Sequence, residues 1–262
     1  MQKMAVIDLD DTLLCPDKQI SGANLEALHT LRKNRFEIII ASGRHHKNII
    51  GFEDRIGRQG WVVSSNGAVV RHAQTAAMLQ EFTLSVSQAR AIHQYGTESG
   101  CSLIGYHRDG VFAESDSEWT RPYAKNAGWQ PSRGNLLFLA ATGLEKLLLT
   151  GPEVRIDELE PEAERKFGSE MYVVRTADEI LEIAASGTNK ALGAQAVART
   201  LGIESQNVVA FGDGNNDVEL LAWAGLSVAM SHGRETARRA AKLISPPGSP
   251  ATAFARAVRA VL

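Results

Sequence analysis

Three carboxylates stand within four positions near the start of the chain, at Asp8, Asp10 and Asp11. They directly follow Met4–Ile7, a short apolar run with the character of a buried β-strand. Because like charges this close repel one another, a positive group is expected beside them. A solvated acidic loop is the simplest alternative. The position at a strand end favours a functional site, because sites in parallel α/β sheets form beyond the carboxyl ends of strands.

A second acidic segment, Gly212–Asp217, follows another strand-like run, Val208–Phe211. If both strands are central in one sheet, the two acidic segments converge at its edge. Several carboxylates form an oxygen-only ligand set for a hard divalent cation, and Mg²⁺ fits best because it keeps positions for water and substrate phosphate. An EF-hand calcium loop is the competing interpretation. It requires glycine and glutamate where this chain has Val218 and Ala224.

Two further segments have residue types that bind anions. Ser42-Gly43-Arg44 follows the strand-like run Glu37–Ala41. A hydroxyl and a glycine at a helix start can present an oxygen and N–H groups to an anion, although Ser-Gly alone is typical of an ordinary turn. Lys190 stands near the start of a predicted helix, where the helix dipole disfavours a cation. A bound phosphoryl group would reverse that penalty, whereas a solvated surface lysine is the alternative.

Short buried strands that alternate with helices must position these residues. Helices are expected from Ser21 to about Lys33, over Thr188–Leu201 with Gly202 at its end, and over Asn216–Ala224. This alternation predicts βαβ units and a doubly wound α/β fold with a mostly parallel sheet. The predicted strands are Met4–Ile7, Glu37–Ala41, Trp61–Val63, Val208–Phe211 and Leu226–Met230.

The middle of the chain has a mixed α+β pattern. A helix is expected over Ser85–Gly100, and a hairpin turns through Arg108-Asp109-Gly110. Further strands and a charged helix from about Pro152 to Lys166 follow. The pattern predicts an inserted domain over residues 83–187, within a core domain formed by residues 1–82 and 188–262.

Composition excludes several classes of protein. The net charge of −2 argues against a nucleic-acid surface, and no apolar run has the length of a membrane span. The N-terminus lacks a secretory layout, and Cys15 and Cys101 suggest neither a disulfide framework nor a cysteine metal site. We therefore expect a cytoplasmic enzyme with no nucleic-acid or membrane partner.

The chemistry-bearing segments, taken in order, resemble the four motifs of the haloacid-dehalogenase superfamily. These segments are Asp8-x-Asp10-x-Thr12, Ser42-Gly43-Arg44, Lys190 and Gly212-Asp213-x-x-Asn216-Asp217. The last motif and Ser65–Ala68 are most similar to the Cof-like branch of sugar-phosphate phosphatases. In that branch an α/β cap is inserted between the second and third motifs, which is where the predicted inserted domain lies.

The resemblance implies a Mg²⁺-dependent phosphomonoester hydrolase that acts on a small phosphorylated metabolite, with a sugar phosphate as the expected substrate class. It implies that Asp8 is the nucleophile, which forms an aspartyl-phosphate, and that Asp10 acts as general acid and then as general base. It assigns Mg²⁺ to Asp8, Asp10, Asp213 and Asp217, and phosphoryl contacts to Ser42, Gly43, Lys190 and Asn216. Thr12 would orient the loop, Arg44 would contact substrate or brace the acidic loop, and Asn66 would lie near the site.

Two alternative functions use the same residues. A phosphomutase or phosphotransferase would replace water with a hydroxyl acceptor. A non-catalytic receiver would hold a phospho-aspartate with Mg²⁺, but receivers are usually shorter and have no use for an acid at Asp10. The chain also departs from the family pattern, with Asp11 at a position that is often glycine and with Ser231-His232 in place of Asn-Ala. These departures leave the substrate-side contacts open.

Overall fold

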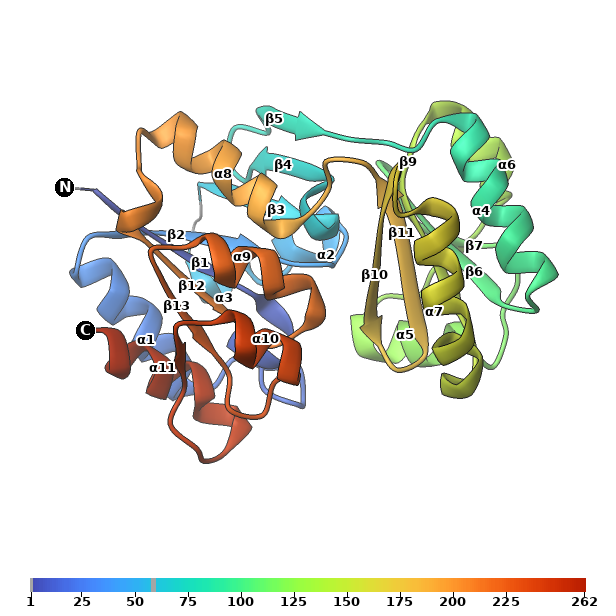
Figure 1. The fold of residues 1–262 in the computed structure, drawn as a ribbon. Coiled ribbons are helices and arrows are strands. Elements are labelled where there is room, and N and C mark those ends of the chain that lie inside the picture. The colour runs from blue at the N-terminus through green and yellow to red at the C-terminus, as the bar shows by residue number, and fades with distance from the viewer. Residues whose placement is uncertain (1, 58–59) are drawn as a thin grey trace. The chain divides into compact units, whose positions relative to one another are not determined.

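The computed structural model describes residues 2–57 and 60–262 of the chain. The chain divides into two compact units, Met1–Gln80 with Asn189–Leu262, and Glu81–Thr188 (Figure 1). We call them unit 1 and unit 2. The α/β fold class predicted from the sequence is confirmed by the sheet in unit 1. The assignment of unit 1 as a catalytic core and of unit 2 as a cap stays a prediction.

Unit 1 is built on a sheet with the strand order β14-β13-β12-β1-β2-β3-β4-β5. The pairs from β14 to β3 are parallel, and β4 runs antiparallel to β3. Ile7, the last residue of β1, lies in register with Phe211 and Ile40, so three strands end at one edge. The strands are β1 (Lys3–Ile7), β2 (Phe36–Ala41), β3 (Trp61–Ser64), β4 (Val69–His72), β5 (Met78–Glu81), β12 (Val208–Gly212), β13 (Leu226–Ala229) and β14 (Leu243–Ile244).

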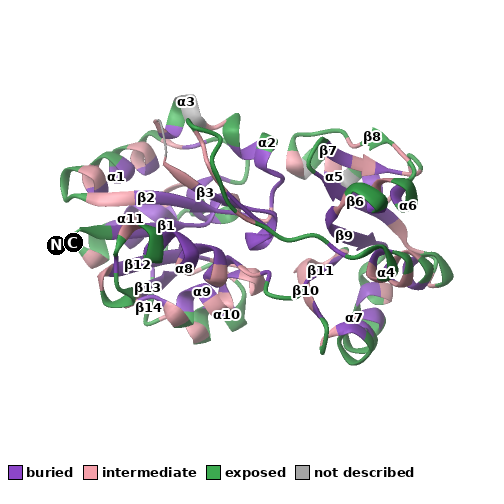
Figure 2. Cartoon of the chain, turned by 90° about the horizontal axis from the view of Figure 1, so that it is seen from above, coloured by how far each residue is buried: buried purple, intermediate pink, exposed green. Residues whose placement is uncertain are grey.

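Helices cover both faces of this sheet (Figures 1 and 2). Successive side chains of a strand point to opposite faces, so Ile7 packs toward α1 and α11 while Val6 packs toward α8 and α9. Both layers are apolar and buried, which fixes the sheet between them. The helices are α1 (Gly22–Lys33), α2 (His46–Ile50), α3 (Glu53–Ile56), α8 (Lys190–Leu201), α9 (Val218–Trp223), α10 (Glu235–Ala240) and α11 (Ala253–Val261).

Local signals fix the helix ends. Ser21 caps α1, because its side chain accepts a hydrogen bond from the Asn24 N–H. α8 ends as predicted at Gly202, which has φ +66°. Its start differs from the prediction at Thr188: the side chain of Asn189 accepts from the Leu192 N–H, so the helix begins at Lys190.

Unit 2 contains a sheet with the strand order β10-β11-β9-β6-β7-β8, in which only the β7–β8 pair is parallel. One face packs against α4, α6 and α7, and the other carries a smaller cluster around Tyr106 and Tyr123. The elements are α4 (Val86–Glu98), β6 (Ser102–His107), β7 (Gly110–Ala113), α5 (Thr120–Ala127), β8 (Ser132–Arg133), α6 (Leu136–Leu139), β9 (Leu144–Thr150), α7 (Glu153–Phe167), β10 (Met171–Ala177) and β11 (Ile180–Ala185).

Unit 2 also contains a buried ion pair. The Lys146 Nζ lies 2.6 Å from Glu182 Oε2 and 4.3 Å from the centre of the Tyr106 ring, and the Lys146 side chain is fully buried. Within the described part of the chain, none of the helices has the length and apolar character needed to cross a membrane.

Candidate active site

The loop after β1 has an irregular backbone. Leu9–Leu13 form a π-helical turn in which Asp10 is extended and Asp11 is left-handed, with φ +56°. The Asp8 N–H donates to the Phe211 carbonyl oxygen at 2.9 Å, which continues the β1–β12 pairing up to the loop. Asp8 is therefore held at the sheet edge, and the turn that follows presents its carboxylate beyond the strand.

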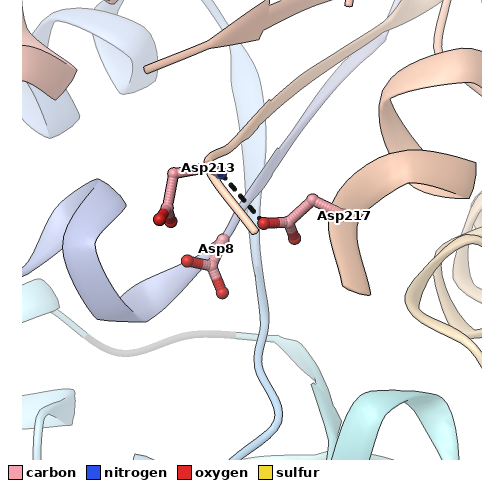
Figure 3. A group of neighbouring side chains, drawn as sticks. All are labelled: Asp8, Asp213 and Asp217. Atoms are coloured by element: carbon pink, nitrogen blue, oxygen red, sulfur yellow. Dashed lines mark hydrogen bonds between the residues drawn. The ribbon is translucent and has the colours of Figure 1, made fainter. Parts of the chain in front are cut away.

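Asp8, Asp213 and Asp217 lie together at this edge (Figure 3). Each offers a carboxylate oxygen within 4.8 Å of the others. Asp8 and Asp217 are buried, and Asp213 is partly exposed. The two acidic segments that the sequence analysis expected to converge thus meet in space.

Two of these carboxylates also bind neighbouring protein groups. Oδ2 of Asp217 accepts hydrogen bonds from the N–H groups of Asp213 and Gly214, each at 2.9 Å. Oδ1 of Asp213 accepts from the Thr12 hydroxyl at 2.9 Å. Asp217 thereby shapes the loop after β12, and Thr12 links that loop to the loop after β1.

Lys190 lies beside the acidic cluster rather than in solvent. Its Nζ is 2.6 Å from Asp8 Oδ1 and 2.7 Å from Asp217 Oδ1, and its side chain is 1% exposed. The lysine is the first residue of α8, so the helix aims its side chain at the sheet edge. The positive group that the acidic loop requires is therefore Lys190, which follows unit 2 in the sequence.

The electrostatics of the cluster follow from burial and close charges. Burial raises the pKa of Asp8, and repulsion from Asp217 and Asp213 adds to this against the attraction of Lys190. Burial and the Asp217 charge likewise raise the pKa of Asp213 to about 7. Burial disfavours the ammonium of Lys190, but attraction to Asp217 and Asp8 outweighs it and raises the pKa of that lysine.

The donor set of this cluster fits a hard divalent cation. All three residues offer carboxylate oxygens, which Mg²⁺ prefers. Burial is the main cause of the raised pKa values of Asp8 and Asp213, and repulsion between the neighbouring carboxylates adds to it. A divalent cation among them would relieve the repulsion and favour their ionised forms.

Asp10 points to a different set of partners. Its carboxylate accepts two hydrogen bonds from the Arg44 guanidinium, from Nε and from an Nη atom, both at 2.7 Å. Lys18 Nζ lies 3.2 Å from the same carboxylate. Burial raises the pKa of Asp10, but the hydrogen bonds and charge of Arg44, with help from Lys18, outweigh this and lower it. Of the two roles expected for Arg44, the structure contains the contact that braces the acidic loop.

A second polar cluster joins the loops after β2 and β3. The Ser42 Oγ accepts from the Arg44 N–H at 3.1 Å, and the Ser42 carbonyl accepts from the Asn66 N–H at 3.0 Å. The Asn66 Oδ1 accepts from Asn216 Nδ2 at 2.8 Å. A Cβ on Gly43 would lie 3.1 Å from that same Oδ1. The four predicted residues Ser42, Gly43, Asn66 and Asn216 therefore form one chain of contacts across the sheet edge.

Gly67 sets the position of the start of α8. Its φ is +95°, and a Cβ at this position would lie 2.2 Å from the Asn189 carbonyl oxygen. Glycine lets the turn after β3 approach the helix backbone directly before Lys190. Gly67 was not predicted as a functional residue, although it lies in the Ser65–Ala68 segment that carries the family resemblance.

Several further residues lie outside the two polar clusters described above or make contacts that the sequence did not predict. His45 and His46 are buried, and Cys15 is buried with its thiol near the Ala251 carbonyl. Lys18, which pairs with Asp10, was not foreseen. Neither was the contact of His232, whose Nε2 lies 2.8 Å from the Asp11 carbonyl oxygen.

Comparisons with known proteins identify the family of the chain. The chain matches the haloacid dehalogenase-like hydrolase family over residues 5–252. It is 27% identical to HMP-PP phosphatase of Cronobacter sakazakii over 88% of this chain and 85% of the relative. It is also 27% identical to HMP-PP phosphatase of Serratia proteamaculans, again over 88% of this chain and 85% of the relative.

Solved structures show the same fold. A haloacid dehalogenase-like hydrolase from Bacteroides thetaiotaomicron superposes with a TM-score of 0.86 at 23% identity, covering 100% of both chains. A sugar phosphatase of HAD subclass IIB superposes with a TM-score of 0.85 at 19% identity, covering 99% of both chains. The family resemblance inferred from the four motifs is confirmed by the match over residues 5–252. The chain belongs to the haloacid dehalogenase-like hydrolase family, as an enzyme of the phosphatase type.

Proposed function

We propose that this phosphatase is a Mg²⁺-dependent phosphomonoester hydrolase that acts on a small phosphorylated metabolite through an aspartyl-phosphate at Asp8. The observation that carries the proposal is the position of Asp8. Its carboxylate lies at the sheet edge beside two further carboxylates and the ammonium of Lys190. A carboxylate in such a setting could approach a dianionic phosphate once the Lys190 ammonium and a bound divalent cation together offset the repulsion.

The reaction has two steps at phosphorus. An Asp8 oxygen forms a bond to phosphorus as the bond to the ester oxygen breaks, and Asp10 gives a proton to the departing oxygen. Water then attacks the phosphorus of the aspartyl-phosphate, and Asp10 takes a proton from that water. The second step releases inorganic phosphate and restores Asp8 and Asp10 to their starting states.

Asp10 needs a change of partners for this role. Its carboxylate now accepts two hydrogen bonds from Arg44, and these hold its pKa low. A general acid must carry a proton, so Asp10 must exchange the guanidinium for the ester oxygen when substrate is bound. Arg44 would then be free to contact the substrate, which reconciles the two roles expected for it.

Asp8, the Asp10 backbone carbonyl and Asp213 would hold Mg²⁺, with support from Asp217. Bound there, the ion would shield the charge between nucleophile and phosphate. Lys190, Ser42, Asn216 and the Gly43 N–H would contact the phosphoryl oxygens, where charge is spread in the transition state. Lys190 already lies against Asp8, and the contact between Asn66 and Asn216 orients the Asn216 amide.

We further propose that unit 2 is the cap and that the substrate is a sugar phosphate, in the cytoplasm. The sugar phosphatase with the same fold supports the substrate class, and the relatives named HMP-PP phosphatase supply a second compound to assay. The net charge of −2 agrees with a small-molecule substrate rather than nucleic acid.

The test is turnover of p-nitrophenyl phosphate with and without Mg²⁺, followed by a panel of sugar phosphates and HMP-PP. We expect sustained turnover that requires Mg²⁺ and that Asp8→Asn abolishes, whereas the exposed-site control Glu26→Gln leaves it unchanged. One-time labelling without sustained release would favour a receiver. Strict dependence on an activating bisphosphate would favour a phosphomutase. Wild-type turnover by Asp8→Asn would refute the mechanism.

A further inference from the structure

The loop after β13, Met230–Arg234, is anchored on the loop after β12. The Arg234 N–H donates to the Asp213 carbonyl at 2.7 Å, and the Met230 N–H donates to the Gly212 carbonyl at 2.9 Å. A Cβ on Gly233 would lie 2.7 Å from the Asp213 carbonyl oxygen, so the two backbones are in direct contact. His232 therefore projects from a segment that is fixed on both sides.

From this segment His232 reaches a third loop. Its Nε2 lies 2.8 Å from the carbonyl oxygen of Asp11, in the turn after β1. A carbonyl oxygen can only accept, so Nε2 carries the hydrogen and donates it. In the sheet β12 lies between β13 and β1, so this bond spans the β12 loop and joins the outer two of three neighbouring loops.

The residue that accepts this bond has a disfavoured backbone conformation. Asp11 has φ +56°, in the left-handed region that side-chain-bearing residues adopt at a cost. Two contacts hold it there: the bond from His232 to its carbonyl, and Lys18 Nζ at 3.4 Å from its Oδ1. Asp11 directly follows Asp10, and the Asp10 carbonyl belongs to the peptide that joins the two residues, so the φ angle of Asp11 is linked to the direction of that carbonyl.

We propose that His232 is a positioning residue for the phosphatase reaction, which fixes the left-handed turn at Asp11 and thereby holds Asp10 in place. The proposal rests on the function proposed above. It assigns a role to a position where this chain departs from the family pattern, and the role requires a hydrogen-bond donor at the Nε2 position and nothing else of the imidazole.

Isosteric variants separate this role from others. The amide nitrogen of glutamine can occupy the position of Nε2, whereas that of asparagine reaches only the position of Nδ1. His232→Gln keeps the donor to the Asp11 carbonyl, and His232→Asn and His232→Ala lose it. His29→Ala, an exposed histidine on α1, is the control.

Steady-state kinetics with p-nitrophenyl phosphate and Mg²⁺ provide the test, with thermal unfolding to establish that each variant folds. We expect His232→Ala and His232→Asn to lower kcat about three- to tenfold, the range of one hydrogen bond, with KM within about twofold of wild type. His232→Gln and His29→Ala should keep kcat within about twofold.

Three results would overturn the proposal: wild-type kcat in His232→Asn, a Gln variant as impaired as the Ala variant, or a rise in KM at constant kcat, which would mean substrate contact instead. Asp8→Asn separates this failure from failure of the proposed function. If Asp8→Asn is inactive and His232→Asn is normal, only the positioning role is lost. If Asp8→Asn is active, the phosphatase mechanism itself is wrong.

Discussion

Lys190 Nζ lies 2.6 Å from Asp8 Oδ1, although 182 positions separate the two residues in the sequence. The contact is buried and is shared with Asp217, so one ammonium serves two carboxylates. Charged groups removed from water need such partners, and the arrangement therefore couples folding of unit 1 to assembly of the site.

Replacing Lys190 should cost both stability and activity. Lys190→Met leaves Asp8 and Asp217 without their shared cation, and removing one partner from a buried charge cluster costs about 3–5 kcal/mol. Urea unfolding at pH 7 measures this, and kcat should fall with it. The exposed Lys33→Met is the matched control and should change the free energy of unfolding by less than about 0.5 kcal/mol.

Mg²⁺ should stabilise the protein through Asp213. An ion that binds only the folded state adds about 2.7 kcal/mol when present at a hundredfold excess over its Kd. The thermal midpoint should therefore rise with Mg²⁺ and return to its starting value with a chelator. Asp213→Asn should lose most of this rise, whereas Glu26→Gln should keep it. An unchanged response in Asp213→Asn would place the ion elsewhere.

Asp10→Asn should separate the two chemical steps. Loss of general acid–base catalysis lowers rates about 10²- to 10⁴-fold. p-Nitrophenolate leaves without much help from an acid, so the first step should be less affected than attack by water. Rapid-quench measurement should then show a burst of one p-nitrophenol per enzyme and a phosphoryl group on Asp8. The absence of a burst would mean that the first step stays rate-limiting.

Acid should destabilise the protein through His46. Burial, with a contribution from the Arg71 charge, lowers the pKa of His46 to about 4, and its Nδ1 has no hydrogen-bond partner among the described residues. Between about pH 6.5 and pH 4 the unfolded chain binds a proton at this histidine and the folded chain does not. The free energy of unfolding therefore decreases as the pH is lowered through this range, by on the order of 3 kcal/mol.

His46→Gln should flatten this dependence, as measured by urea unfolding at pH 7 and pH 5. His29→Gln replaces an exposed histidine and should leave the slope unchanged. Equal slopes in wild type and His46→Gln would show that another group titrates in this window.

In unit 2, the buried pair of Lys146 and Glu182 should behave differently from an exposed pair. Glu182→Gln removes the negative charge that faces the buried ammonium and should cost on the order of 3 kcal/mol. The double variant Lys146→Met/Glu182→Leu should be more stable than Glu182→Gln, since no buried charge remains. Glu158→Gln breaks the exposed pair with Arg155 and should cost at most about 0.5 kcal/mol. Urea unfolding of the four proteins decides this.

Sequence reasoning anticipated much of the fold because its signals are local. β-Branched runs such as Glu37–Ala41 and glycines such as Gly202 act within a few residues. The convergence of Asp8 and Asp213 followed from one topological rule for parallel sheets. The strands β4 and β5, which extend the sheet beyond β3, were not predicted.

Contacts between distant loops could not be read in this way. The sequence left open whether Arg44 contacts substrate or braces the acidic loop, and it did not indicate that Asn66 would meet Asn216. Such contacts depend on side-chain rotamers and on the register of separate strands. The sequence placed Lys190 in the site through a resemblance, but its pairing with Asp217 is a result of packing.

Gly67 has a consequence for how this protein can vary. Even one methyl group there would collide with the carbonyl of Asn189 and displace the first turn of α8, and with it the ammonium that faces Asp8. In a library that samples every amino acid at each position, position 67 should accept glycine alone. A residue with no side chain would then be as intolerant of replacement as the nucleophile.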